Sequence, residues 1–228
     1  SEELMNSGNY SLVPNYADVF SSGQQWGTEV IWSINMVEDL DGHWGEHEGS
    51  WLSIWFGDRD MGWGYGFKCP TEDFVQAFEP TDTRLEASVV FDGEMIPGIF
   101  GGAPHDFTGG SWNPPTGYMS QKYLIPDNER PITADCNGNL DYIFMRYADL
   151  LLIHAEASME IGDEDAAKSS LKLIRERAGL SAYPDAATIN SYKETYLLNH
   201  EELRAVVYHE RRIELGLEHD RFYDLVRW

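Results

Sequence analysis

The feature that most constrains the fold is the segment RYADLLLIHAEASMEIGDEDAAKSSLKLIRERAGL, which covers Arg146 to Leu180. Apolar residues recur at intervals of three and four on both sides of Gly162-Asp163, and this spacing predicts two consecutive amphipathic helices. Gly162 suits the turn between them, and Gly179 suits the left-handed backbone that often follows a helix end. Small alanines on both helices allow a close approach, as in a tetratricopeptide hairpin.

A single hairpin of this kind cannot bury its apolar face alone, because helical repeats are stable only when they stack on neighbours. Either the front half of this chain covers the face that carries Leu150, Leu151 and Ile153, or helices outside the chain do, and we favour the second. Periodicity predicts a further amphipathic helix over Glu201–Gly216 and a short one over Arg221–Arg227, but neither repeats the hairpin.

The part of the chain before Asp141 is predicted to be mostly irregular. TEVIWSINM alternates in polarity and predicts a strand, with Trp32 packed in the core. A short helix capped by a threonine is expected within Thr71–Pro80, and LEASVVFDGEMI predicts a hairpin that turns at Asp92-Gly93. The Gly- and Pro-rich stretch Pro97–Asn139 is expected to be loop.

Composition excludes several classes of function. The 228 residues carry 39 acidic and 16 basic side chains, a formal charge of −23, which argues against nucleic-acid or anionic-membrane binding and mildly against a polyanionic substrate. The chain has no apolar run of about 18 residues, the length that a membrane-spanning helix needs. Cys69 and Cys136 form no metal-binding pair; a disulfide and two free thiols both remain open.

Two blocks of sequence resemble the C-terminal half of the SusD/RagB family, outer-membrane lipoproteins of Bacteroidetes that capture glycans or other nutrients. The first block comprises RYAD-x-LL-x-x-AEA, at Arg146–Ala157, and R-x-RAGL, at Arg175–Leu180. The second block is the ending ER-x-x-EL…E-x-x-R-x-x-DL-x-RW, which is matched by Glu210, Arg211, Glu214, Leu215, Glu218, Arg221, Asp224, Leu225, Arg227 and Trp228. His219 stands where the family usually has glycine, so the turn there is expected to differ.

The resemblance implies a mainly α, SusD-like fold with a tetratricopeptide-like hairpin and a large loop-rich region containing a few short strands. Residues 1–228 would be the C-terminal part of a single SusD-like domain, irregular and ligand-binding over 1–140 and helical over 141–228. The family's N-terminal helices and lipidated cysteine would lie outside this chain. The implied partners are that N-terminal part and a SusC-like TonB-dependent transporter, at the extracellular face of the outer membrane.

The charged residues near the C-terminus predict a structural ion-pair network, not an active site. In RRIELGLEHDRFYDLVRW, Arg211 and Glu214 lie three residues apart, as do Arg221 and Asp224, while Glu214 and Glu218 lie four apart. Residues at these intervals lie on one helix face, where opposite charges can pair along the helix. Arginine also suits partly buried, bidentate pairing with carboxylates.

Two enzymatic interpretations compete with binding, and neither is favoured. HWGEH, at His43–His47, has the H-x-x-E-H spacing of an inverted zinc-protease motif, but that chemistry needs a helix and the stretch is crowded with glycines. The pairs Glu46/Glu48 and Asp58/Asp60 offer a glycosidase acid and base, yet acidic pairs in a loop are usually only solvated. We therefore expect no catalytic residue, no cofactor and no metal site.

The run WGEHEGSWLSIWFGDRDMGWGYGF places seven aromatic residues within 24 positions, without the regular period of a core segment. Rings on an irregular backbone, beside Asp and Arg, suit stacking on sugar rings and bonding to their hydroxyls. The alternative is that some rings fill the core, as expected for Trp228. The predicted ligand-binding residues are Trp44, Trp51, Trp55, Asp58, Arg59, Asp60, Trp63, Tyr65 and Trp112.

The sequence thus predicts a non-enzymatic protein that captures an oligo- or polysaccharide at the cell surface for import through a TonB-dependent transporter. A secreted glycoside hydrolase is the alternative, and an isolated helical-repeat adaptor is a third possibility that leaves the aromatic run without a role.

Overall fold

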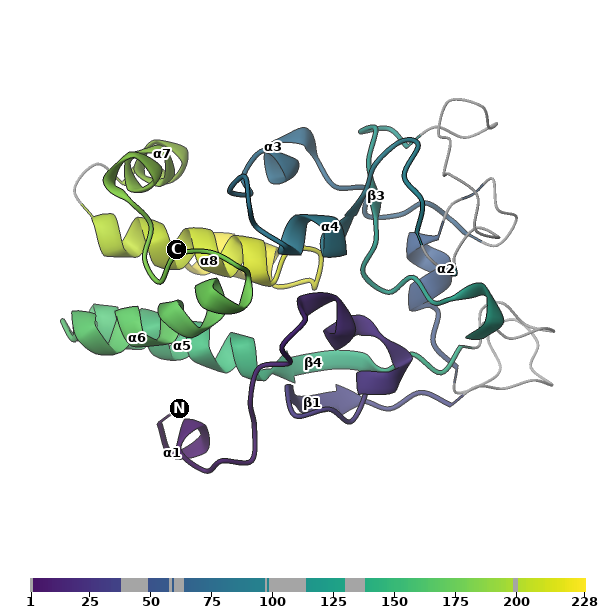
Figure 1. The fold of residues 1–228 in the computed structure, drawn as a ribbon, viewed down its shortest axis with the longest axis horizontal. Helices are drawn as coiled ribbons and strands as arrows, with labels where there is room; N and C mark the ends of the chain where they lie inside the picture. The colour runs from purple at the N-terminus through teal and green to yellow at the C-terminus, as the bar shows by residue number, and fades with distance from the viewer. Residues whose placement is uncertain are drawn as a thin grey trace.

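The computed structural model describes residues 2–37, 49–57, 59, 64–96, 98, 114–129, 138–198 and 201–228. Long helices make up the C-terminal part, and short elements joined by loops make up the rest (Figure 1). The short elements are α1 (Glu2–Met5), the 3-10 helices η1 (Tyr16–Phe20), η2 (Ser22–Gln24) and η4 (Asp127–Glu129), β1 (Val30–Ile34), α2 (Leu52–Phe56), α3 (Glu72–Val75), α4 (Arg84–Ser88), β2 (Val89–Val90), β3 (Met119–Ser120) and β4 (Tyr142–Arg146).

The predicted helical hairpin is confirmed by α5 (Tyr147–Glu160) and α6 (Glu164–Arg177). The turn between them has Gly162 at φ +81°, and Gly179 after α6 has φ +78°, conformations that favour glycine. The Asp163 carboxylate accepts a hydrogen bond from the backbone of α6, at 3.1 Å, and so caps its first turn.

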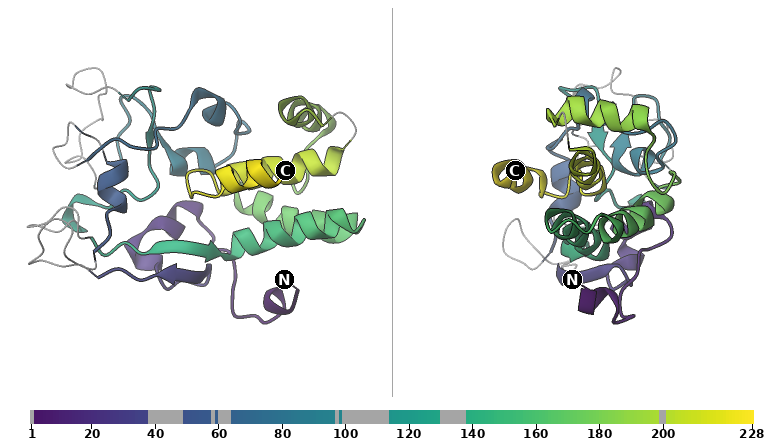
Figure 2. Two further views of the ribbon diagram at one scale, coloured as in Figure 1. Left: turned by 180° about the vertical axis from the view of Figure 1, so that it is seen from behind. Right: turned by 90° about the vertical axis from the view of Figure 1, so that its left-hand side faces the viewer.

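The expectation that the hairpin needs cover from outside the chain is wrong for Leu150 and Leu151. Both are buried, and only Ile153 is substantially exposed, at 40%. The cover comes from α8 (Glu202–Glu214), which packs against both α5 and α6, with α7 (Ala186–Tyr196) on its other side. Figures 1 and 2 show these helices in successive layers, with α9 (Arg221–Arg227) at one side.

Strand β1, predicted from its alternation, pairs antiparallel with β4, which leads directly into α5. The sequence had suggested only helix after Asp141, so β4 was missed. The register opposes Ile34 to Tyr142 and is interrupted by a bulge near Trp32. The prediction that Trp32 lies in the core is wrong, because its side chain is 56% exposed and packs on the exposed Phe144, at 4.4 Å between ring centroids.

The turn predicted at Asp92-Gly93 is present, with Glu94 N donating to Phe91 O at 3.1 Å, but the hairpin predicted around it is wrong. Its first residues form α4, and the short β2 that follows pairs with β3 from a distant part of the chain. The Asp82 carboxylate accepts hydrogen bonds from the backbone and side chain of Arg84, at 3.0 and 2.9 Å, which supports a helical turn there. The threonine-capped helix is confirmed by α3, where Thr71 accepts a bond from Phe74 N, at 3.3 Å.

The predicted ion-pair network exists, but the predicted pairs do not form: most bonds join separate elements, and Arg227 with Asp224, at 3.0 Å, is a pair that runs along α9. The buried Glu214 contacts Arg84 and Arg146, at 3.1 and 2.6 Å, and also Arg177. Arg211, predicted to pair with Glu214, binds Asp224 of α9 and Asp149 of α5 instead. These bonds hold the helical layers to each other and to the sheet.

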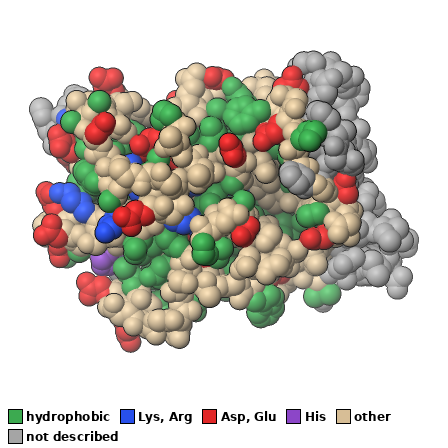
Figure 3. Space-filling model, viewed as in Figure 1, with side chains coloured by type: hydrophobic (Ala, Val, Ile, Leu, Met, Phe, Trp, Pro, Cys, Tyr) green, Lys and Arg blue, Asp and Glu red, His purple; other side chains and the backbone are tan. Residues whose placement is uncertain are grey.

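Acidic side chains are spread over the face of the molecule that Figure 3 shows, while Lys and Arg gather at fewer places. This distribution agrees with the formal charge of −23. Among the described residues, no helix has the length and apolarity that crossing a membrane requires.

Candidate functional site

The described part of the aromatic run is organised by α2, a helix of five residues. Leu52, Ile54 and Phe56 point into the protein and are at most 5% exposed, with Phe56 stacked on Tyr123 at 5.3 Å. A turn of helix cannot bury every side chain, and here Trp55 is left on the outside, 42% exposed. The sequence therefore holds a large aromatic ring at the surface on a backbone that the core fixes.

Backbone hydrogen bonds fasten two neighbouring segments to α2. Tyr65 and Phe67 donate their N–H groups to the carbonyls of Ile54 and Trp55, at 2.8 and 2.7 Å. On the other side, Ser50 pairs with Gly138 through two bonds, of 2.7 and 3.2 Å. Trp55 is thus flanked by paired backbone on both sides, which limits how far it can move.

A pocket of about 530 Å³ opens beside Trp55, and we call it the aromatic pocket. Its walls come from the end of β1, the start of β4 and the segment that leads into α2. The lining residues are Ile34, Met36, Gly49, Ser50, Trp51, Leu52, Trp55 and Tyr142. This volume lies within the range of about 300–1,000 Å³ that is usual for ligand pockets.

The aromatic surface continues from the pocket along the sheet. Tyr142 lines the pocket and lies 6.4 Å from Phe144, which in turn packs on Trp32 at 4.4 Å between centroids. Ile34, opposite Tyr142 in the register, is 49% exposed. Because side chains two apart lie on one face of a strand, the bulky residues of β1 and β4 form a continuous apolar strip.

The buried Asp141 lies next to the aromatic pocket, because two residues of its lining, Met36 and Tyr142, are its hydrogen-bond partner and its neighbour in sequence. Asp141 Oδ1 accepts a hydrogen bond from the backbone N–H of Met36, at 2.8 Å. Asp141 Oδ2 is buried and has no hydrogen-bond partner among the described residues. Burial raises the pKa of Asp141 above its ordinary value, although the hydrogen bond from Met36 acts to lower it. Sequence reasoning missed Asp141, because a single Asp before a strand carries no recognisable pattern.

The structure brings together only part of the predicted site. Trp51 and Trp55 line the aromatic pocket. Tyr65 and Arg59 do not line it: the Tyr65 ring packs on Phe67, at 5.6 Å between centroids, and Arg59 is exposed. The other predicted ligand residues lie outside the described residues, namely Trp44, Asp58, Asp60, Trp63 and Trp112.

The rejected zinc motif at His43–His47 and the residue Cys136 also lie outside the described residues. Within the part of the chain that is described, no group of His, Cys, Asp or Glu side chains is arranged to hold a metal ion. The expected core residue Trp228 is half-buried and stacks on Tyr208, at 3.6 Å between centroids.

Comparison with known proteins identifies the family. A family model described as the SusD family matches residues 28–228. The chain belongs to the SusD family. Two curated relatives come from Formosa agariphila: SusD-like protein P25 is 25% identical over 99% of this chain and 44% of its own length, and SusD-like protein P2 is 40% identical over 40% of this chain and 17% of its own length.

Solved structures of SusD-like proteins show the same fold. Surface glycan-binding protein A from Bacteroides uniformis is 26% identical, with a TM-score of 0.64 over 99% of this chain and 43% of that one. A SusD-like protein from Bacteroides fragilis is 24% identical, with a TM-score of 0.74 over 100% of this chain and 49% of that one. The SusD-family chain therefore spans less than half the length of these proteins.

A third structure shows a related protein with its ligand. It is surface glycan-binding protein A from Bacteroides thetaiotaomicron in complex with laminarihexaose, 22% identical to this chain, with a TM-score of 0.69 over 99% of this chain and 48% of that one. The mainly α, SusD-like fold expected from the motifs is confirmed by these matches.

Proposed function

We propose that this chain is part of a cell-surface protein that captures an oligo- or polysaccharide and passes it to a SusC-like TonB-dependent transporter. The protein acts without catalysis, at the extracellular face of the outer membrane, through a lipid anchor outside this chain. Membership of the SusD family and the glycan-binding relatives support this proposal. The observation that carries it is the exposed Trp55 ring beside the aromatic pocket.

The chemistry of the aromatic pocket suits a sugar. Sugar rings present apolar C–H faces that stack on indole and phenol rings, while their hydroxyl groups need hydrogen-bond partners. Trp55 and Tyr142 supply rings within this lining, while the buried Ser50 uses its hydroxyl to accept a hydrogen bond from Leu52 N, at 3.3 Å. A stack of this kind contributes roughly 0.5–1.5 kcal/mol per ring beyond the area that it buries, so several rings are needed for useful affinity.

The test measures affinity and melting temperature together for Trp55→Ala, with laminarihexaose as the first probe and a panel of neutral oligosaccharides beside it. Loss of one stacking ring should weaken binding about 2- to 10-fold. The melting temperature should stay within about 2 °C of the wild type, because an exposed ring has little packing to lose. Trp51→Ala, at the half-buried neighbour, should weaken binding and also lower stability.

Trp26→Ala is the matched control, since Trp26 is 82% exposed and does not line the aromatic pocket. It should change neither affinity nor melting temperature. The proposal fails if Trp55→Ala and Trp51→Ala both leave binding to every bound glycan unchanged. Release of shorter sugars during the titration would instead favour a glycoside hydrolase.

A further inference from the structure

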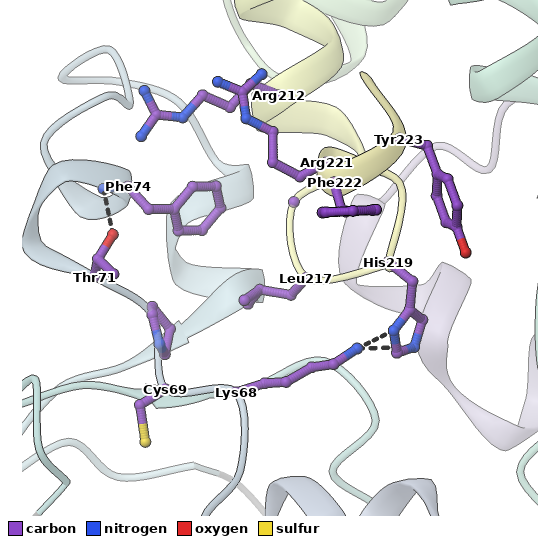
Figure 4. A pocket seen from close by; sticks show the side chains of 12 residues that line it. Lys68, Cys69, Thr71, Phe74, Arg212, Leu217, His219, Arg221, Phe222 and Tyr223 are labelled. Carbon is purple, nitrogen blue, oxygen red and sulfur yellow. Dashed lines mark hydrogen bonds between the residues drawn. The ribbon is translucent and has the colours of Figure 1, made fainter. Parts of the chain in front are cut away.

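A second cavity, of about 610 Å³, lies away from the aromatic pocket, and we call it the cationic pocket. It opens between the loop that leads into α3 and the turn that joins α8 to α9 (Figure 4). Its lining residues are Lys68, Cys69, Pro70, Thr71, Phe74, Arg212, Gly216, Leu217, His219, Arg221, Phe222 and Tyr223.

The charge of this lining is opposite to that of the chain. The protein carries 39 acidic and 16 basic residues, yet none of the twelve lining residues is Asp or Glu. Lys68, Arg212 and Arg221 contribute three basic groups, and His219 adds an imidazole. Acids adjoin the lining: Asp73 is largely exposed and pairs with Arg212, Glu218 and Asp220 alternate with lining residues in the turn after α8, and the charge of Asp224 acts on Arg221. The lining itself thus offers only basic charged groups in a protein whose net charge is strongly negative.

Arg221 distinguishes this pocket from the structural ion pairs. Arg84, Arg146 and Arg211 each bind at least two carboxylates. Arg221 Nη1 is buried and has no hydrogen-bond partner among the described residues. Its guanidinium contacts the rings of Tyr196 and Trp228, at 5.8 and 5.6 Å from their centroids. Burial lowers the pKa of Arg221, as expected for a cation without a partner carboxylate.

Lys68 supplies a second cation that no carboxylate neutralises among the described residues. Its ammonium group contacts both ring nitrogens of His219 and lies 5.2 Å from the centroid of the Phe56 ring. Burial lowers the pKa of Lys68 to about 8, so the side chain is still mainly charged at neutral pH. In Figure 4 the Lys68 ammonium and the Arg221 guanidinium lie at opposite sides of the lining, with Phe222 between them, so each would meet a different part of an incoming ligand.

The backbone of this pocket is strained. Among the described residues, five that are not glycine have positive φ, and three of them line the cationic pocket: Lys68 at 55°, Leu217 at 69° and His219 at 84°. Each such conformation costs of the order of 1–3 kcal/mol and tends to occur where a fold holds a functional group in place. His219 is also the position where the family usually has glycine, so this chain keeps a side chain there despite the strain.

Apolar groups complete the lining. Phe222 and Tyr223 are each 69% exposed, and Phe74 forms the inner wall with Gly216. Rings at the opening beside unpaired cations suit a ligand that has both an apolar face and a negative charge. A sugar that carries an anionic group has both features.

We propose that the cationic pocket binds two anionic substituents of an acidic glycan, uronic-acid carboxylates or sulfate esters, one at Lys68 and one at Arg221, with a sugar ring between them against Phe222. This inference rests on the proposed glycan binding and adds the class of sugar. The net charge of −23 does not prevent it, because charges farther than about 8 Å are largely screened at physiological ionic strength.

Calorimetric titration of the complete protein that contains this chain tests the proposal with three probes of the same length: oligogalacturonides, sulfated galactan oligosaccharides and neutral galactan oligosaccharides. Lys68→Gln and Arg221→Gln should each weaken binding of an anionic probe about 10- to 100-fold, the effect of losing a charge-assisted hydrogen bond. Lys172→Gln, which removes the same charge from the surface of α6, should change affinity less than about 2-fold.

The outcomes separate this inference from the function on which it rests. Tighter binding of one anionic probe than of its neutral counterpart, lost in both pocket variants, supports the proposal and tells carboxylate from sulfate. Binding of laminarihexaose or neutral galactan without binding of either anionic probe overturns the cationic pocket but leaves glycan capture intact. Anionic binding that survives both substitutions also overturns it. Failure to bind any probe counts against both proposals. Melting temperatures of all variants show whether a loss reflects unfolding.

Discussion

Glu214→Gln tests the buried network directly. Glu214 is fully buried at the end of α8, and its carboxylate contacts Arg84, Arg146 and Arg177, which come from three other parts of the chain. Glutamine keeps the shape of the side chain but removes its charge and places an amide donor against a guanidinium. The substitution therefore leaves positive charge in the interior without its main counter-charge.

The magnitude follows from the number of cations left behind. Breaking a buried ion pair by removing one partner costs about 3–5 kcal/mol, a large part of the roughly 5–15 kcal/mol that stabilises a typical domain. For a chain of this length, each kcal/mol corresponds to roughly 2–4 °C, so the melting temperature should fall by roughly 6–20 °C. The loss of stability is limited because the three arginines keep other carboxylates: Glu210 still pairs with Arg84, and Glu29 still pairs with Arg146 and Arg177.

The loss should depend on pH in a defined direction. Burial opposes ionisation of Glu214, but Arg177, Arg146 and Arg84 outweigh it and hold the pKa of Glu214 well below 4.5. Because the folded-state pKa lies below the unfolded value, the stabilisation is present above about pH 4.5 and is lost as the pH falls further. The wild type and Glu214→Gln should therefore converge in stability under strongly acidic conditions.

Urea unfolding followed by circular dichroism measures both effects. Glu164→Gln is the control, because its pair with Lys168 is exposed on α6 and should contribute no more than about 0.5 kcal/mol. The reasoning is refuted if Glu214→Gln costs no more than this control near neutral pH, or if its cost is the same at every pH.

Two further substitutions probe the turn after α8. Gly216→Ala should lower the free energy of unfolding in urea by about 1–3 kcal/mol, because a Cβ there would lie 2.4 Å from Phe74 Cζ. The control Gly23→Ala should be almost neutral, since the nearest atom to its Cβ would be 4.0 Å away. Equal losses in the two variants would contradict the prediction. Asp220→Asn should raise the melting temperature near pH 8 but not near pH 4. Burial, and then the charges of Asp149 and Glu218, raise the pKa of Asp220 from 3.8 to about 6, so the ionised carboxylate destabilises the fold at high pH. No gain near pH 8 would refute it.

Local patterns predicted the elements that local forces determine. Periodicity indicated α5, α6, α8 and α9, and their ends agree with the structure to within two residues. Thr71 was identifiable as a cap because its side chain accepts a hydrogen bond from the backbone three residues ahead; Asp163 caps α6 in the same way but was predicted only as part of the turn. These contacts lie within one turn of helix, so a short window of sequence contains them.

Contacts between distant residues could not be predicted in this way. The sequence indicated α8 but not that it lies against α5 and α6, so Leu150 and Leu151 were wrongly expected to lack cover. Glu214 was assigned to Arg211 on spacing alone, whereas it binds guanidiniums from residues 37 to 130 positions away. Spacing along a helix shows which pairs are possible, and tertiary packing decides which of them form.

The candidate site shows the same division. Composition pointed to Trp51 and Trp55, because glycines and charges interrupt the aromatic run and disfavour a core role. It gave no indication of Tyr142 or Asp141, which reach the site only because β4 pairs with β1. The cationic pocket escaped notice for the same reason, since Lys68 and Arg221 are far apart in sequence.

One residue links the core to the site. Arg146 ends β4, and its guanidinium binds Glu29, Glu214 and Glu218 at 2.6–2.8 Å. Glu29 directly precedes β1, and its carbonyl accepts a hydrogen bond from Tyr147 N at 2.7 Å, so both strands are clamped where they meet the helices. Their opposite ends carry the aromatic pocket. A clamp at one end holds the strands in register while the loops at the other end remain free to differ in sequence, which is how one scaffold can serve different ligands.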